Sequence, residues 1–133
     1  MAKNVQDVMS KDLRCCSLSS TVPDVAHIMT AYDISAVVVL DDDGFLAGII
    51  TRTDLVALRG SDEYWHGLTA EHVMKTDVVT CTPDTPMRDA SKTLVQRGIH
   101  RLVVVENTEN SEKVRPVGVL SQTDIVRDMA LSS

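Results

Sequence analysis

The chain contains an internal repeat, and this feature restricts its possible folds more than any other. Val8-Met9 recurs 65 residues later as Val73-Met74, and the offset then grows to 70, as between Gly48 and Gly118. The extra five residues fall in the polar stretch at residues 107–113, where a loop can lengthen at little cost. A single unit of this kind leaves a sheet face uncovered. We therefore expect two similar units that pack together about a pseudo-twofold axis.

Each repeat predicts the same order of elements, β-α-β-β-α. A short apolar stretch is followed by a helical pattern of apolar residues, with Pro23 and Pro86 near the first turn. The β-branched runs at residues 36–40 and 102–105 are continuously apolar, which is typical of a strand covered on both faces. Residues 41–44 predict a turn, after which the chain returns as a second strand.

The final helix of each repeat begins near Arg52 and near Gln122. The predicted fold class is therefore α/β, with two tandem β-α-β-β-α repeats. Residues 1–60 form the first repeat, residues 61–69 a linker and residues 70–133 the second repeat, and together they make one compact module. Hydrophobic residues make up 44% of the 133 residues, which is enough for a sizeable core, and an aromatic content of 3% makes that core aliphatic.

Charge and composition argue against several classes of partner. The net charge is −6, whereas binding to nucleic acid depends on a positive surface that displaces counterions. No apolar run approaches the roughly 20 residues of a membrane-spanning helix. The first residues also lack the basic and apolar regions of a signal peptide. We expect a cytoplasmic protein.

The cysteines and histidines do not indicate an enzyme or a metal site. Cys15, Cys16 and Cys81 have neither the spacing of zinc ligands nor the even number of a disulfide framework, so we expect small buried thiols. No histidine lies near a Cys or Ser nucleophile in an elbow-like setting, and no paired carboxylates occur outside turns or helix starts. We predict that the chain is not an enzyme and needs no catalytic cofactor.

The second strand of each repeat runs into the final helix through a shared motif. It reads GIITRTD at residues 48–54 and GVLSQTD at residues 118–124. A carboxylate such as Asp54 or Asp124 can accept hydrogen bonds from a vicinal diol, and a helix N-terminus presents free N–H groups to an anion. The same residues also fit a capping box, which closes the helix terminus and needs no ligand.

The duplication, the element order and this motif closely resemble the CBS (cystathionine-β-synthase-type) domain pair family over nearly the whole chain. In that family the motif Asp accepts hydrogen bonds from the ribose hydroxyls of an adenosine ligand, and the Ser or Thr lies near the phosphates. The resemblance implies ribose contacts for Asp54 and Asp124. The hydroxyl residues of the motif are further ligand candidates: Thr51, Thr53, Ser121 and Thr123.

A second candidate element is His100-Arg101, which precedes the β-branched run of the second repeat. In CBS pairs that bind adenine nucleotides, a His-Arg at this position commonly faces the phosphates, and the guanidinium fork suits phosphate oxygens. The alternative is a polar strand end wetted by solvent. The first repeat has Ser35-Ala36 here, but it carries Arg52 in its motif where the second repeat has Gln122. We therefore expect two unlike clefts.

The resemblance also implies where the adenine would lie, between the first short strand and the strand after the helix. The candidate apolar lining residues are Leu13, Ile34, Val78 and Ile99. In related modules the adenine edge is read by backbone groups, which here would be those near Cys15-Cys16 and Thr80-Cys81. Because backbone readout leaves little side-chain signature, the sequence does not identify the nucleotide.

The function implied by the resemblance is that of a stand-alone energy sensor. It would bind AMP, ADP or ATP and signal to a protein partner by a conformational change. Such modules usually form homodimers through their helices, so a homodimer is expected. Two alternatives stay open: an interaction module whose clefts are vestigial, and a sensor of S-adenosylmethionine, which shares the adenosine but carries a sulfonium and no phosphate.

Overall fold

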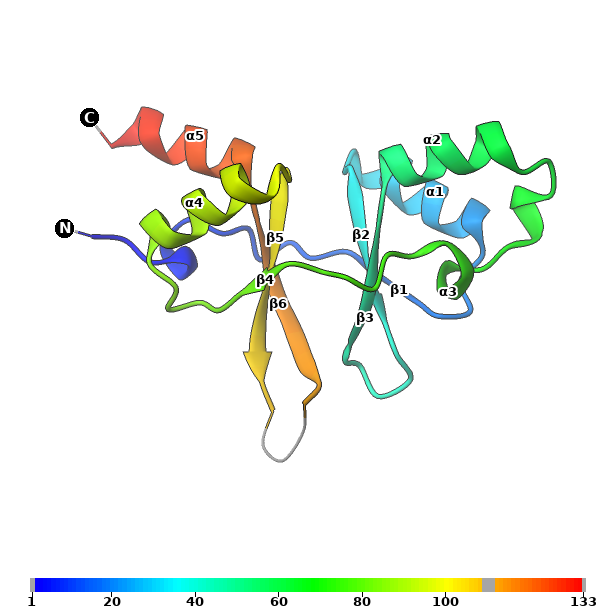
Figure 1. The fold of residues 1–133 in the computed structure, drawn as a ribbon, viewed down its shortest axis with the longest axis horizontal. Helices are drawn as coiled ribbons and strands as arrows, with labels where there is room; N and C mark the ends of the chain where they lie inside the picture. The colour runs from blue at the N-terminus through cyan, green and yellow to red at the C-terminus, as the bar shows by residue number, and fades with distance from the viewer. Residues whose placement is uncertain (1, 109–111, 133) are drawn as a thin grey trace. The chain divides into compact units, whose positions relative to one another are not determined.

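The computed structural model describes residues 2–108 and 112–132, and the chain divides into two compact units. Residues 14–78 form one of them, which we call the first-repeat unit. The chain up to Leu13, together with the chain from Val79 onward, forms the second-repeat unit. Each unit contains helices and one three-stranded sheet (Figure 1), so the predicted α/β fold class is confirmed.

The first-repeat unit follows the predicted order β-α-β-β-α and adds two short helices. Its elements are β1 (Cys15–Ser17), α1 (Val22–Tyr32), β2 (Ala36–Leu40), β3 (Leu46–Thr51), α2 (Arg52–Ser61), the 3-10 helix η2 (Trp65–Gly67) and α3 (Ala70–Val73). Strand β2 lies in the centre of the sheet, parallel to β1 and antiparallel to β3. Helix α2 begins at Arg52 as predicted and ends at Ser61, so the first residue of the predicted linker is helical.

The second-repeat unit has the same topology. Its elements are the 3-10 helix η1 (Val5–Asp7), β4 (Thr80–Cys81), α4 (Met87–Arg97), β5 (Arg101–Asn107), β6 (Val114–Ser121) and α5 (Gln122–Leu131). Strand β5 is longer than predicted because Glu106 and Asn107 also pair with β6. The predicted loop extension falls between β5 and β6, and residues 109–111 of it lie outside the described residues.

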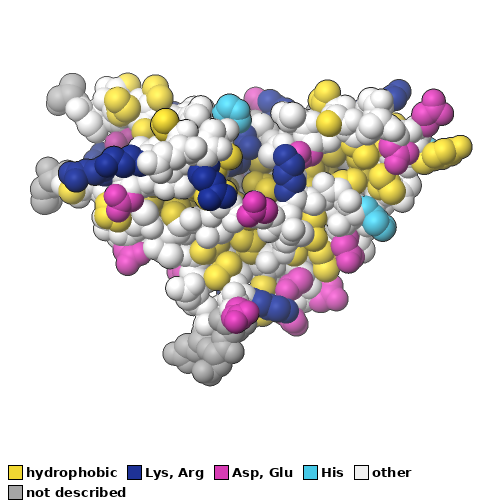
Figure 2. All heavy atoms as spheres, in the orientation of Figure 1, with side chains coloured by type: hydrophobic (Ala, Val, Ile, Leu, Met, Phe, Trp, Pro, Cys, Tyr) yellow, Lys and Arg dark blue, Asp and Glu magenta, His cyan; other side chains and the backbone are white. Residues whose placement is uncertain are grey.

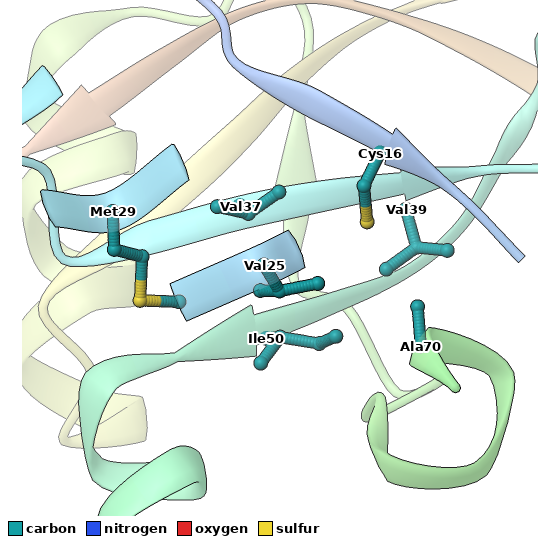
Figure 3. Packing of buried hydrophobic residues seen from close by; sticks show 7 residues of the cluster. All are labelled: Cys16, Val25, Met29, Val37, Val39, Ile50 and Ala70. Atoms are coloured by element: carbon teal, nitrogen blue, oxygen red, sulfur yellow. The ribbon is translucent and has the colours of Figure 1, made fainter. Parts of the chain in front are cut away.

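Figure 1 shows the longer helices of each unit on one side of its sheet. The core of each unit lies between these helices and the sheet. In the first-repeat unit, Val25 and Met29 are four residues apart and therefore lie on one face of α1. They pack against alternate residues of β2, Val37 and Val39 (Figure 3). The full cluster is Cys16, Val25, Met29, Val37, Val39, Ile50 and Ala70. The second-repeat unit has an equally aliphatic cluster of Val5, Ala90, Leu94, Leu102, Val104 and Leu120.

The segment that leads into each repeat packs in the unit of the other repeat. The N–H of Val5 donates to the carbonyl of Thr85 at 2.9 Å, and η1 thereby belongs to the second-repeat unit. At the equivalent position of the other unit, the N–H of Ala70 donates to the carbonyl of Ser20 at 2.7 Å. Val5 and Ala70 are both fully buried, so each leading segment supplies a core residue to the unit that it joins.

The same leading segments explain the glycine of the motif. Lys75 pairs with Ile49 through two backbone hydrogen bonds of 3.0 Å, and this brings the segment directly across Gly48. A Cβ atom at Gly48 would lie 2.7 Å from Met74 Sδ and 2.8 Å from the carbonyl oxygen of Lys75. The equivalent Gly118 is crossed in the same way by the segment that contains Ser10, so a side chain fits at neither position.

Candidate functional site

Each motif forms a capping box at the N-terminus of its helix. Thr51 Oγ1 accepts the N–H of Asp54 at 3.3 Å, and Asp54 Oδ2 accepts the N–H of Thr51 at 2.8 Å. The corresponding distances between Ser121 and Asp124 are 3.1 and 2.9 Å. The capping interpretation of the motif is therefore correct. Each capping box uses only one oxygen of its carboxylate, Oδ2, and the other oxygen, Oδ1, lies outside the cap.

Helix α1 provides an internal reference for a capping box outside the motif. Thr21 and Asp24 exchange the same two hydrogen bonds, at 3.2 and 3.1 Å. Asp24 is exposed, whereas the side chains of Asp54 and Asp124 are only 11% and 14% exposed. Capping alone does not require this burial, because Asp24 caps its helix at the surface. The two motif carboxylates are thus less exposed than their role as helix caps requires.

The two Oδ1 atoms differ in the cations beside them. Lys75 Nζ lies 3.1 Å from Asp54 Oδ1, whereas Arg127 Nη1 lies 3.9 Å from Asp124 Oδ1. Partial burial alone would raise the pKa of the Asp54 carboxyl. The hydrogen bonds from Thr51 and the ion pair with Lys75 outweigh the burial and hold this pKa below its usual value. Asp54 is therefore a carboxylate at neutral pH.

The predicted phosphate contacts of the second repeat lie together at the start of α5. Arg101 is paired with Ser121 across β5 and β6, which places it next to the cap residue. The N–H of Gln122 donates to the carbonyl of His100 at 3.0 Å, and His100 Nδ1 lies 3.5 Å from Gln122 Oε1. Thr123 follows in the first turn of the helix and is exposed. The structure thus brings this set of predicted residues to one end of the sheet.

The corresponding end of the first-repeat unit is chemically different. Arg52 Nη2 donates to Asp33 Oδ1 at 3.1 Å, so the guanidinium predicted for phosphate lies against a carboxylate of its own unit. Thr53, in the first turn of α2, is exposed. The residue equivalent to Asp33 is Gly98, which brings no charge. The expected difference between the two repeats therefore extends to their local electrostatics.

The predicted adenine contacts fall partly on the cores and partly on a sheet edge. Ile34 and Ile99 are half-buried and pack against the core clusters of their own units. The carbonyl of Arg14 accepts from the N–H of Val38 in β2, so the next residue, Cys15, directs its N–H and C=O to the unpaired edge of β1.

By the same alternation, Thr80 directs its backbone groups to the unpaired edge of β4, because the carbonyl before it, that of Val79, accepts from Val103. These two backbone edges are the predicted adenine-reading positions. The side chain of Cys16 belongs to the core, and Cys81 packs against the other core from a half-buried position.

The three cysteines are free thiols with low reactivity. Cys16 is buried as predicted, whereas Cys15 and Cys81 are only half-buried. Burial raises the pKa of Cys16 and of Cys81 to about 11, and it also raises the pKa of Cys15. All three are therefore protonated at neutral pH and are poor nucleophiles or metal ligands in that form.

The described residues offer no other candidate site of a different kind. Between residues 2 and 132, leaving out 109–111, no three His, Cys, Asp or Glu side chains are grouped to hold a metal ion. No helix in that part of the chain has the length and hydrophobicity needed to cross a membrane. Acidic, basic and hydrophobic side chains are interspersed on the face shown in Figure 2.

The two repeats match a known protein family. The family model of the CBS domain matches residues 5–60 and 70–131. The chain belongs to the CBS domain family. This CBS domain pair is 31% identical over 104 residues to CBS domain-containing protein YhcV of Bacillus subtilis, which covers 77% of the chain and 73% of that protein. It is 28% identical over 126 residues to 5′-AMP-activated protein kinase subunit gamma-3 of Sus scrofa, which covers 85% of the chain and 24% of that protein.

Known structures confirm the CBS domain pair fold. The chain is similar to the CBS domain pair of protein MJ0100 in complex with 5′-methylthioadenosine and S-adenosyl-L-methionine, with a TM-score of 0.87, 23% identity and full coverage of both chains. The chain spans only about a quarter, or less, of the length of the curated enzymes that it matches. The similarity to these enzymes is thus confined to a segment of the size of a CBS domain pair, which is a regulatory module.

Sequence reasoning missed Lys75 as a neighbour of the first motif. It lies 21 residues after Asp54, and no periodicity connects the two. A signal was available in the repeat alignment, where Lys75 stands opposite Ser10 and thus marks a charged residue in one copy alone. Only the three-dimensional path of the leading segment shows that this lysine reaches the carboxylate.

Proposed function

We propose that this CBS domain pair is a regulatory module that binds an adenine nucleotide (AMP, ADP or ATP) through the carboxylates of its motifs. The observation that carries the proposal is a partly buried capping carboxylate that occurs twice and keeps Oδ1 outside the cap. An ionised carboxylate is an acceptor for the two adjacent hydroxyls of a ribose. Asp24, which only caps a helix, lacks the burial of Asp54 and Asp124.

The start of α5 supports a ligand that carries phosphate. His100 and Arg101 lie beside Ser121, and the first-turn N–H of Thr123 is not used by the cap. The positive end of a helix dipole and a planar guanidinium both favour a phosphate group. The relation to a subunit of an AMP-activated kinase points in the same direction. In the other unit, Arg52 lies in an exposed ion pair with Asp33.

S-Adenosylmethionine is a second candidate, because the similar pair of protein MJ0100 binds it together with 5′-methylthioadenosine. The ribose contact would be the same for both ligands, and the difference would lie at the 5′ end. Arg101→Ala should weaken the binding of AMP, whereas binding of the sulfonium compound should be retained. Titration of this variant with both compounds therefore separates the two ligand classes.

We further propose that the module acts as a homodimer in the cytoplasm and regulates a protein partner. The exposed apolar residues of the long helices support a helical interface: Val56 on α2, and Val126 and Met129 on α5, are 73%, 64% and 69% exposed. Sedimentation should then give twice the chain mass of 14.5 kDa. Nucleotide would signal only by binding two arrangements of the module with different affinity.

The proposal is tested by a pair of matched Asp→Asn substitutions. Asp124→Asn keeps an oxygen that can complete the cap but loses the charge, so we expect affinity for the bound nucleotide to fall roughly ten- to a hundredfold, as for a lost hydrogen bond to a charged group. Asp24→Asn makes the same change in the reference capping box and should leave affinity unchanged. Equal affinity of both variants and the wild type in a calorimetric titration would refute the ribose assignment.

A further inference from the structure

The two motif carboxylates are not equally available, and the cause is one residue of the leading segment. Lys75 and Ser10 occupy equivalent positions, because Lys75 pairs with Ile49 and Ser10 pairs with Val119, each directly after the motif glycine. The backbones of the two segments therefore cross their units in the same register. Their side chains differ, because Lys75 brings an ammonium group to the motif carboxylate of its unit, whereas Ser10 is uncharged.

In the first-repeat unit, both oxygens of the motif carboxylate already have partners. Asp54 Oδ2 accepts the N–H of Thr51 in the cap, and Oδ1 lies 3.1 Å from Lys75 Nζ. A ribose hydroxyl that binds Oδ1 must therefore displace or share the ammonium of Lys75. In the second-repeat unit, Arg127 Nη1 lies 3.9 Å from Asp124 Oδ1, so this ion pair is looser. The two cationic side chains are similarly exposed, at 70% for Lys75 and 67% for Arg127, and the difference between the sites is therefore the distance.

We propose that Lys75 is an internal competitor for the ribose at Asp54, so that the two sites are unequal and the Asp124 site takes an adenosyl ligand first. This inference rests on the proposed function, because it assigns an order of occupancy to the same two carboxylates. The first site fills at a higher ligand concentration, since its ribose must displace or share the ammonium. One chain can thus respond to two concentration ranges of one ligand.

The test isolates each site and then changes the competitor. In an Asp124→Asn background, Lys75→Met should tighten binding of both AMP and adenosine at the Asp54 site by about three- to fivefold, the effect of losing an ion pair with one exposed partner. In an Asp54→Asn background, Ser10→Lys should weaken binding at the Asp124 site to a similar extent. Lys11→Met, at an exposed neighbouring position, is the control and should change neither affinity.

A measurement without ligand accompanies the titrations. Lys75→Met should raise the pKa of Asp54 in a carbon-detected NMR titration, because the ammonium that stabilises the carboxylate is lost. An unchanged pKa of Asp54 would overturn the inference, as would equal or weaker adenosine binding by the Lys75→Met variant. Weaker binding of AMP alone would also overturn it, because Lys75 would then be a phosphate contact. If neither compound binds the wild type or any variant, the proposed function fails and the inference fails with it.

Discussion

Replacing Gly48 with alanine is expected to lower the free energy of unfolding by about 2–3 kcal/mol, the upper part of the range for overpacked positions. The new Cβ would lie 2.8 Å from the carbonyl oxygen of Lys75, and this oxygen is held in place by its hydrogen bond to Ile49. The Met74 side chain could move aside, but the backbone could not do so without breaking the pairing of the leading segment. Urea denaturation of the variant and the wild type measures the difference.

Gly60 gives the matched control for this substitution. It lies in helix α2, and a Cβ atom there meets no atom within 4 Å. Gly60→Ala should therefore stabilise the protein by about 0.5–1 kcal/mol, because alanine is the better helix former. Opposite signs for the two Gly→Ala variants are the expected result. A neutral or stabilising Gly48→Ala would show that the leading segment does not cross the motif as described.

The second large effect is expected at Val5, close to the beginning of the sequence. Val5 is fully buried in the core of the second-repeat unit, among residues that follow it by more than 80 positions. Val5→Ala removes two methyl groups from a closed core and should cost about 2 kcal/mol of unfolding free energy through lost burial and the cavity left behind. The measurement is again a denaturant titration.

Val95→Ala makes the same chemical change on an exposed face of α4, where the residue is 80% exposed. It should change the unfolding free energy by less than about 0.5 kcal/mol. If Val5→Ala were as mild as Val95→Ala, the leading segment would not contribute to the core. Hydrogen exchange adds a local test, because strand β5, which contains Leu102 and Val104, should lose protection in the Val5 variant.

The local elements of this fold could be predicted from the sequence because local patterns determine them. The β-branched runs became the central strands β2 and β5, and the final helices begin at Arg52 and Gln122 as predicted. A capping box needs only residues three positions apart, so the caps at Asp54 and Asp124 were also within reach of sequence reasoning.

The non-local features could not be predicted in the same way. The repeat offset equates Val5 with Ala70, but it does not say in which unit either residue packs. Likewise, Arg52 matched a phosphate contact by its place in the motif, while its pairing with Asp33 depends on how α1 ends beside α2. Each of these contacts joins segments whose relative path is set by the whole unit, and no local pattern encodes it.

The measurement that tests the central claim most directly is a calorimetric titration of nucleotide-stripped protein with AMP, ADP, ATP and S-adenosylmethionine, supported by thermal shift. The account predicts saturable binding of at least one of these compounds. At about a hundred times its dissociation constant, that compound should add roughly 2.7 kcal/mol of stability. No heat and no shift with any of the four would contradict an adenosyl-binding site, and the chain would then be better explained as an interaction module with vestigial clefts.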